Sequence, residues 1–345
     1  MPNKNTNFSI IITAYNRKNY IYKAFLSALQ QNYPRDNYEI IVVSNFMDEE
    51  INKSSAVSPN FIKIVATDKM GYGSKLKEGI DIASGEYICF LDDDDMFTED
   101  KLSSLNDLIL KENNIGIIKN YCHLIDSLGN RMVMKSNTND ILALAEPLNY
   151  YNIKYKDKGG YYIIDQNQSR YTDFIRAFSN TSSLTILKTI IEKYSNILSR
   201  ILIGPEDFLL TVAMVENKKC IITESKLTKY RVHNNNNSTN QDITRQLHFS
   251  LNLSADFSVS ANLANNTGYK TSLRVISSRL YIVSIYKYYK LNGLFNTLKF
   301  LKKRELILDI GYAIFGQPDL YVFKLPMFMF KFVFKKLVKS NSSES

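Results

Sequence analysis

Two spacings of hydrophobic positions alternate over the first hundred residues. Short apolar, β-branched runs predict strands buried on both faces at 8–13, 38–43, 62–65 and 86–91. Between them, apolar residues recur at helical spacing and predict helices over 19–32 and 74–84. Pro34 ends the first helix, and Gly85 is placed to cap the second. Strands alternating with helices predict an α/β fold with a mostly parallel sheet and helices on both faces.

The pattern is mixed between about 115 and 235. It predicts a strand, a turn and a strand over 121–131, a loop over 146–169, and helices over 184–194 and 208–217. A polar run at 234–237 predicts a loop and a domain boundary. From about 243 onward the pattern is helical to the last residue. We therefore expect one α/β domain over 1–240 and an all-helical region over 241–345.

Charge is distributed unevenly along the chain. The net charge is +9, yet residues from Lys270 onward hold fourteen Lys or Arg and four Asp or Glu, a balance of +10. A basic C-terminal third favours an anionic partner surface. No zinc-finger, helix-turn-helix or RNA-binding motif accompanies this charge, so we expect no nucleic acid and favour an anionic membrane surface.

The three cysteines and the first residues bear on the compartment. Cys89, Cys122 and Cys220 have no disulfide or metal-binding spacing and indicate buried thiols in a reducing compartment. The polar first seven residues do not resemble a signal peptide. We therefore expect a cytoplasmic protein.

Four consecutive aspartates, Asp92 to Asp95, directly follow the strand predicted at 86–91. Ligands of open parallel sheets bind at the carboxyl ends of strands. Residues i and i+2 leaving a strand point the same way, so Asp92 and Asp94 converge on one site. Their hard carboxylate oxygens suit Mg²⁺ or Mn²⁺, which in turn hold diphosphate oxygens. The alternative is a solvated acidic turn or helix start, since Asp favours both.

These aspartates belong to a longer pattern. The segments 71–79, GYGSKLKEG, and 83–95, ASGEYICFLDDDD, resemble the donor site of family 2 glycosyltransferases, which have the GT-A fold. The opening SIIITAYNR at 9–17 and QNYP at 31–34 resemble the same family. The resemblance implies a GT-A-like domain with a donor half over about 8–115 and an acceptor half over 116–240. It also implies metal-dependent, inverting transfer from a nucleotide diphosphate-sugar.

Several residues take roles by position in this family. The resemblance implies that Ala14, Tyr15 and Arg17 line the nucleotide pocket and that Lys77 faces the donor diphosphate. Asp92 would meet the ribose or the metal, and Asp94 the metal. Without the resemblance, Lys77 is equally a solvent-facing helical lysine and Tyr15 equally a core aromatic.

The second strand departs from the family pattern. The family has Asp-Asp-Gly-Ser at its end, and the acidic pair helps to read the nucleobase, whereas this chain has Ser44-Asn45-Phe46-Met47. Asn45 offers both a donor and an acceptor to a base edge. A donor of the UDP or the GDP type stays open.

On the acceptor side, Gly204-Pro205 precede Glu206 and Asp207. Proline at a helix start followed by two acids is explained by the helix N-terminus alone. The pair also resembles the family's Glu-Asp motif, which implies that Asp207 deprotonates the acceptor hydroxyl and Glu206 positions the acceptor.

A second acceptor-side segment runs from Tyr230 to His233 and resembles one that closes over the donor diphosphate. The resemblance implies that Arg231 neutralises phosphate charge and that His233 completes the metal shell. A solvated histidine beside a polar loop is the plainer reading of His233.

Aromatic residues and lysines gather in the last helical segment, 325–339, whose lysines fall on one helical face. The segment is too short and too charged to cross a bilayer, so we expect an amphipathic helix docked peripherally on the cytoplasmic face of an anionic membrane. A packing or dimerisation helix is the alternative. A membrane location makes a glycan or lipid-linked molecule the expected acceptor.

Two rival functions share part of this pattern. A nucleotidyltransferase also needs carboxylates, metal and an α/β sheet, but it would have a Gly-rich loop where this chain has Thr13-Ala14-Tyr15-Asn16. A membrane-bound scaffold that has the fold and lacks the chemistry would not need both acidic sets.

Overall fold

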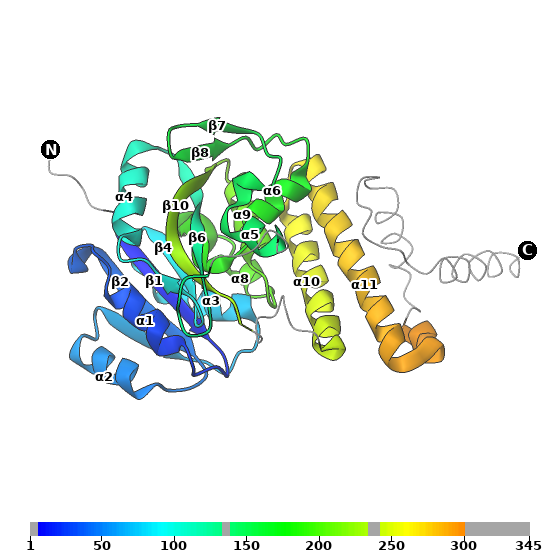
Figure 1. Ribbon diagram of the computed structural model, residues 1–345, viewed down its shortest axis with the longest axis horizontal. Coiled ribbons are helices and arrows are strands. Elements are labelled where there is room, and N and C mark those ends of the chain that lie inside the picture. The colour runs from blue at the N-terminus through cyan, green and yellow to red at the C-terminus, as the bar shows by residue number, and fades with distance from the viewer. Residues whose placement is uncertain (1–5, 133–138, 234–241, 301–345) are drawn as a thin grey trace, which may run out of the picture.

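A computed structural model describes residues 6–132, 139–233 and 242–300. Ten strands form one sheet, in the order β3-β2-β1-β4-β9-β6-β10-β8-β7, with β5 paired to β10 (Figure 1). The strands are β1 (Phe8–Ala14), β2 (Tyr38–Ser44), β3 (Ile62–Ala66), β4 (Tyr87–Asp92), β5 (Met96–Phe97), β6 (Ile115–Ile125), β7 (Tyr155–Asp157), β8 (Tyr161–Ile164), β9 (Leu184–Leu187) and β10 (Lys219–Arg231).

The first four long strands are parallel, as the apolar runs predict. In β1, Ile12 pairs with Val42 of β2 and with Leu91 of β4. All residues of β1 and β2 are buried, because helices cover both faces of this part of the sheet. The α/β class is therefore confirmed, and this part of the sheet is parallel as predicted.

The middle of the sheet is antiparallel. β9 lies between β4 and β6 and runs against both, so the sheet as a whole is mixed. The helix predicted over 184–194 is wrong in its first part, where the chain forms β9 before α7 begins at Lys188. Leu184 and Ile186 are completely buried, and the pairing of β9 with a strand on each edge outweighs their helical spacing.

Two other expectations for the middle fail for a similar reason. The segment 146–169, expected to be a loop, contains the β7–β8 hairpin. β10, which no pattern predicted, has Lys and Thr at many positions and contains register shifts. It is a strand because β6, β8 and β5 all pair with it.

Helices form a layer on each face of the sheet (Figure 1). One layer is α1, α2 and α4, and the other includes α3, α6, α7 and α9. The helices are α1 (Ile21–Leu29), α2 (Glu49–Val57), α3 (Tyr72–Ile82), α4 (Lys101–Lys111), α5 (Asn139–Ala145), α6 (Tyr171–Ala177), α7 (Lys188–Glu192), α8 (Ser195–Leu198), α9 (Glu206–Val215), α10 (Ile243–Leu263) and α11 (Thr267–Phe300).

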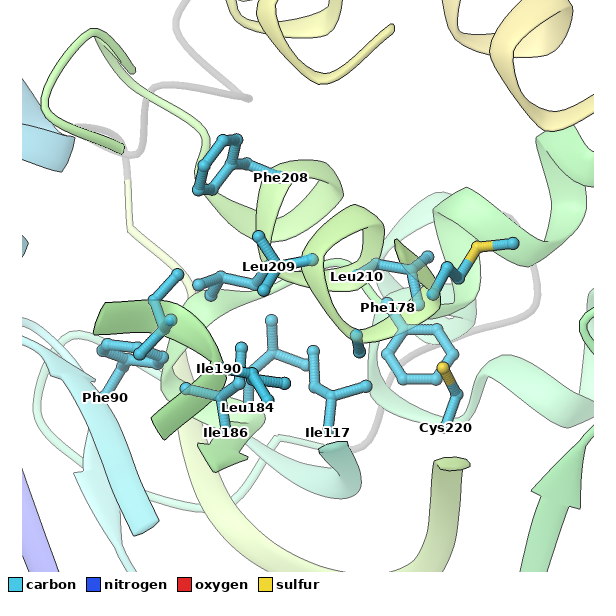
Figure 2. Close-up of a cluster of buried hydrophobic side chains, with 14 of the residues drawn as sticks. Phe90, Ile117, Phe178, Leu184, Ile186, Ile190, Phe208, Leu209, Leu210 and Cys220 are labelled. Carbon is cyan, nitrogen blue, oxygen red and sulfur yellow. The ribbon is translucent and has the colours of Figure 1, made fainter. Parts of the chain in front are cut away.

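α9 packs between the sheet and the C-terminal helices. Figure 2 shows Phe208, Leu209 and Leu210 of α9 above apolar side chains of the sheet, in one buried cluster. α10 packs against both α9 and α11 at one end of the molecule (Figure 1). The helical pattern predicted beyond 243 is thus confirmed as far as residue 300. Within the part of the chain described, no helix is long and apolar enough to span a bilayer.

Gly85 does not cap α3, contrary to the prediction. The C-cap is Ala83, in an extended conformation. A Cβ at Gly85 would lie 2.4 Å from the backbone nitrogen of Ser9, so glycine is needed here for the close approach of two chain segments. The amphipathic helix predicted at 325–339 and the boundary at 234–237 lie outside the described residues.

Candidate active site

A cleft of about 770 Å³ opens at the carboxyl ends of β1 and β4. The acidic loop and residues following β1 line it, together with the start of α9, the loop 202–204 and α10. Tyr15, Arg17, Asp92, Asp94, Glu206 and Asp207 all line this cleft. Residues predicted separately for the donor and the acceptor side therefore share one space.

Asp92, the last residue of β4, is fixed by two neighbours. Its carboxylate accepts a hydrogen bond from the Tyr72 hydroxyl at the start of α3, and its backbone N–H donates to Ser182 Oγ over 3.0 Å. Burial and the charge of Asp94 raise the pKa of Asp92 to about 7. Carboxylates crowded in this way favour a nearby cation.

Arg17 spans the next two aspartates. Its guanidinium pairs with the Asp93 carboxylate through Nε and a terminal nitrogen, and with Asp94 Oδ2 over 2.6 Å. Burial still raises the pKa of Asp93 to about 6. Burial also acts to raise the pKa of Asp94, but the hydrogen bond to His233 and the charge of Arg17 outweigh it and lower that pKa. Asp94 is therefore held ionised.

Arg231 lies in the interior instead of facing the cleft. Its side chain is 0% exposed, and it donates to the backbone carbonyls of Asp94 (2.7 Å), Asp126 (3.0 Å) and Ser127 (3.2 Å). Its backbone N–H donates to Asp95 Oδ1 over 2.9 Å. The predicted diphosphate contact is therefore wrong for this arrangement, in which Arg231 supports the acidic loop from behind.

The carboxylates at 92, 94 and 95 fit a divalent cation. One ligand oxygen from each lies within 4.8 Å of the others, whereas the prediction named Asp92, Asp94 and His233 and did not include Asp95. His233 Nε2 lies 3.1 Å from Asp94 Oδ2, and its ring packs 5.4 Å from that of Tyr20. Oxygen donors with one adjacent imidazole suit Mg²⁺ or Mn²⁺.

The lysine at the cleft is Lys75, two residues before the one predicted. Lys77 pairs with Asp81 over 2.6 Å on the outer side of α3 and does not line the cleft. Lys75 is 5% exposed, lines the cleft and lies 4.6 Å from the Tyr15 ring centroid. Burial lowers the pKa of Lys75, while the charges of Asp93 and Asp92 oppose this shift.

The two remaining nucleotide-pocket residues do not line the cleft itself. Ala14 is buried in the core at the end of β1. Asn45 lies beside the turn after β1, where its amide nitrogen donates to Asn16 Oδ1 over 2.6 Å and its oxygen accepts from the Asn16 backbone over 2.9 Å. Its side chain is thus positioned by Asn16, which has a left-handed backbone with φ of 56°.

The acidic pair opens α9, as predicted. Glu206 Oε1 accepts a hydrogen bond from Thr181 Oγ1 over 2.9 Å. Asp207 is 4% exposed, and its Oδ2 has no hydrogen-bond partner among the described residues. Burial raises the pKa of Asp207 to about 8. A buried carboxyl oxygen without a partner beside a cleft is placed to receive a proton.

A short turn, η3 (Thr181–Ser183), connects the two acidic sets. Thr181 contacts Glu206, and Ser182 contacts the backbone of Asp92. Asn180 begins the turn with φ of 73°, a conformation that asparagine tolerates better than most residues. Two completely buried lysines hold the turn from behind, Lys101 through Ser182 O and Lys119 through Ser183 Oγ.

Sequence reasoning did not identify this turn, Tyr72 or Lys75. The glycines at 73 and 79 were a usable signal, because they mark the buried face of α3, on which Lys75 also lies. Lys77 and Asp81, four residues apart, have the spacing of a surface ion pair.

Comparison with known proteins gives the family and the fold. Residues 9–178 match the sequence model of "Glycosyl transferase family 2". The amylovoran biosynthesis glycosyltransferase AmsB of Erwinia amylovora is 32% identical over 112 residues, 31% of this chain and 36% of AmsB. The curated relatives compared are matched over 15–41% of their own lengths.

Solved structures share the fold at low identity. Staphylococcus aureus TarS 1–349 in complex with UDP-GlcNAc superposes with a TM-score of 0.51 at 13% identity, over 88% of this chain and 80% of TarS 1–349. The mannosyltransferase PcManGT of Pyrobaculum calidifontis, in complex with GDP-Man and Mn²⁺, gives 0.52 at 13%, over 91% of this chain and 82% of PcManGT. The chain thus has the GT-A fold, and residues 9–178 belong to glycosyltransferase family 2.

Proposed function

We propose that this protein transfers a sugar from a nucleotide diphosphate-sugar to an acceptor hydroxyl, with inversion at the anomeric carbon. The observation that carries the proposal is one cleft lined both by Asp92 and Asp94 of the acidic cluster and by Asp207, whose Oδ2 has no hydrogen-bond partner among the described residues. A donor of the UDP or GDP type is supported by the ligands of TarS and PcManGT.

Mg²⁺ or Mn²⁺ would be held by the oxygens of Asp92, Asp94 and Asp95, with His233 beside them. When bound, the metal supplies positive charge that stabilises the leaving nucleoside diphosphate. Lys75 and Arg17 add charge from the protein itself at the same end of the cleft. Tyr72 donates a hydrogen bond to Asp92 and would hold that carboxylate in place as a ligand of the metal.

Asp207 is proposed as the general base. In the ionised form of Asp207, the buried Oδ2 accepts the proton of the acceptor hydroxyl as that oxygen attacks the anomeric carbon. Glu206, held by Thr181, positions the acceptor beside it. Asn45 is proposed to contact the nucleobase at the end of β2.

The acceptor is proposed to be a glycan or a lipid-linked molecule at an anionic membrane surface. The basic balance of +10 after Lys270 supports the membrane, and the name of AmsB, an amylovoran biosynthesis glycosyltransferase, supports a polymeric glycan pathway. We propose a peripheral attachment to the membrane on its cytoplasmic face.

Donor hydrolysis tests the proposal without knowledge of the acceptor. Purified protein is incubated with a panel of UDP- and GDP-sugars and Mn²⁺, and the release of nucleotide is measured. We expect slow, metal-dependent release for one donor and its loss in Asp94→Ala with unchanged circular dichroism. Near-normal release by Asp94→Ala at saturating donor would overturn the metal assignment.

The same assay separates the rival functions. Release of pyrophosphate from a nucleoside triphosphate and a sugar phosphate would favour a nucleotidyltransferase. Absence of any nucleotide binding or hydrolysis across the panel would favour a scaffold that has the fold without the chemistry.

A further inference from the structure

One face of α10 forms the outer wall of the cleft. Arg245, Phe249, Leu253 and Phe257 succeed one another at four-residue intervals and all line the cleft. Four residues advance a helix by about 6 Å, so the three apolar side chains cover roughly 12 Å of wall. This stripe lies outside residues 9–178, which match the glycosyltransferase family.

The stripe is suited to hydrocarbon and poorly suited to sugar. None of its three apolar side chains offers a hydrogen bond, so sugar hydroxyls laid along it would lose water without replacement. Two further apolar side chains at the cleft, Met70 at 76% and Leu202 at 39% exposure, extend the same surface. Exposed apolar surface gathered in a cleft is typical of a ligand site.

The wall is fixed next to the proposed base. Asp256 of α10 is completely buried, and it accepts hydrogen bonds from the backbone N–H groups of residues 202, 203 and 204 over 2.7–3.0 Å. That loop leads directly into Glu206 and Asp207 at the start of α9. Hydrogen bonds from three N–H groups to one carboxylate hold α10 and the base in a set relation.

Arg245, the cation at the end of the stripe, bears on the source of the hydrocarbon ligand. Arg245 is exposed, one helical turn beyond Phe249, and the chain after Lys270 has a balance of +10. A hydrocarbon chain leaving the cleft past Arg245 would meet the positive charge of that side chain, and the basic composition after Lys270 favours an anionic partner such as the headgroups of a bilayer. An acceptor anchored in such a bilayer supplies both the apolar chain and the adjoining negative surface.

We infer that the acceptor is a glycolipid whose hydrocarbon chain lies on Phe249, Leu253 and Phe257 during transfer. This inference rests on the proposed function and narrows its acceptor. The acceptor hydroxyl oxygen forms the new bond to the anomeric carbon, the bond from that carbon to the diphosphate oxygen breaks, and the hydroxyl proton goes to Asp207. The nucleoside diphosphate leaves with the bonding electrons.

Calorimetric titration of the full chain with two probes tests the inference. The probes are n-decyl β-D-glucoside, below its micelle-forming concentration, and methyl β-D-glucoside, which has the same sugar without the chain. We expect the decyl probe to bind at least tenfold more tightly. Leu253→Asn and Phe249→Ser should each lower decyl binding about tenfold and leave methyl binding unchanged.

The matched control is Leu110→Asn, which changes an exposed leucine of α4 outside the cleft and should leave both affinities unchanged. Phe249→Ser covers the case in which Leu253→Asn fails to fold. Equal affinity of the two probes, or an equal loss of decyl binding in Leu110→Asn, would overturn the inference. Binding of UDP and GDP with Mn²⁺, measured on the same samples, reports separately on the proposed function. If nucleotide binding is absent while the decyl probe still binds, the proposed function fails and the apolar site is retained.

Discussion

At the scale of single residues, the orientation of a side chain decides between two neighbouring lysines. Lys77 is on the outer face of α3 with Asp81, whereas Lys75 is nearly buried over Tyr15 at the cleft. The sequence predicted the helix and a lysine of that helix facing the donor. Which of the two lysines does so depends on which face of α3 packs against the sheet. This packing depends on Gly73 and Gly79, which let α3 approach its neighbours closely.

Exchanging each lysine for methionine tests this assignment. Lys75→Met should weaken binding of UDP and GDP in the presence of Mn²⁺ by at least tenfold, because it removes a cation from a partly desolvated site. Lys77→Met, the matched control, should change affinity less than twofold, since an exposed pair with Asp81 contributes little. Calorimetry that finds equal losses in both variants would remove Lys75 from the donor site.

The pKa of Asp207 gives a second prediction, about stability. Its folded-state pKa of about 8 lies above its ordinary value of 3.8, so the folded protein retains a proton that the unfolded chain releases. Its contribution to stability is complete below pH 4 and is lost as the pH rises through 8, by at most about 1.4 kcal/mol per pH unit. Asp207→Asn should therefore gain in melting temperature relative to the wild type between pH 5 and 8.

The same variant separates two readings of the acidic pair. A general base predicts that Asp207→Asn lowers the transfer rate roughly 10²-fold with unchanged donor binding. If the variant has normal specific activity and only its stability changes, Asp207 is not the base. It would then be a residue that stabilises the N-terminus of α9.

At the scale of secondary structure elements, strands buried on both faces and long amphipathic helices were predictable, and the elements that join the two halves were not. β1, β2 and β4 are continuous apolar runs, so their pattern alone identifies them. β9 and β10 are strands because of their neighbours: β9 completes the pairing of β4 and β6, and β10 lies between β6 and β8. The local pattern of hydrophobic residues does not reveal which distant strands will pair with a segment.

The close contact of α3 with α8 gives an element-scale prediction. A Cβ at Gly73 would lie 1.9 Å from the carbonyl oxygen of Leu198, so Gly73→Ala must displace backbone and should lower the free energy of unfolding by roughly 3 kcal/mol. Gly71→Ala, two residues earlier, meets nothing closer than 3.4 Å and should stay within about 0.5 kcal/mol. Urea unfolding of both variants measures the difference.

Displacement of α3 also has a functional consequence. Tyr72 and Lys75 lie on either side of Gly73, so the same substitution should weaken nucleotide binding. A Gly73→Ala protein as stable as Gly71→Ala would show that the contact between the two helices is looser than described here.

At the scale of the whole molecule, the acidic loop and the start of α9 could be predicted from the sequence, but the position of α10 beside them could not. The end of a predicted strand pointed to Asp92 and Asp94, and the resemblance to the family's Glu-Asp motif pointed to Glu206 and Asp207. The outer wall, α10, is connected to the rest through Asp256 and the loop 202–204, a contact across more than fifty residues of sequence. Its four-residue stripe was visible in the sequence, but nothing local related it to the base.

The C-terminal third carries the last prediction, which concerns the membrane. The helix predicted from the sequence over 325–339 would have lysines on one side and aromatic residues around the remainder. Each lysine near an anionic surface contributes about 1 kcal/mol at physiological salt, and the rings lose water contact at headgroup depth. In the full chain, replacing Lys331, Lys335, Lys336 and Lys339 by glutamate should therefore reduce flotation with vesicles containing phosphatidylglycerol.

A change in net charge could by itself weaken binding to anionic vesicles. The control variant must therefore change the net charge by the same amount at positions outside segment 325–339. Glutamate at four exposed lysines of the catalytic domain, Lys23, Lys53, Lys111 and Lys158, alters net charge equally and should leave flotation intact. Raising the salt concentration should weaken binding of the wild type only in part, because screening reduces the electrostatic contribution and spares the apolar one. Donor hydrolysis should persist in both variants, since every proposed catalytic residue precedes residue 240. Equal flotation of the two variants would mean that segment 325–339 serves packing or dimerisation instead.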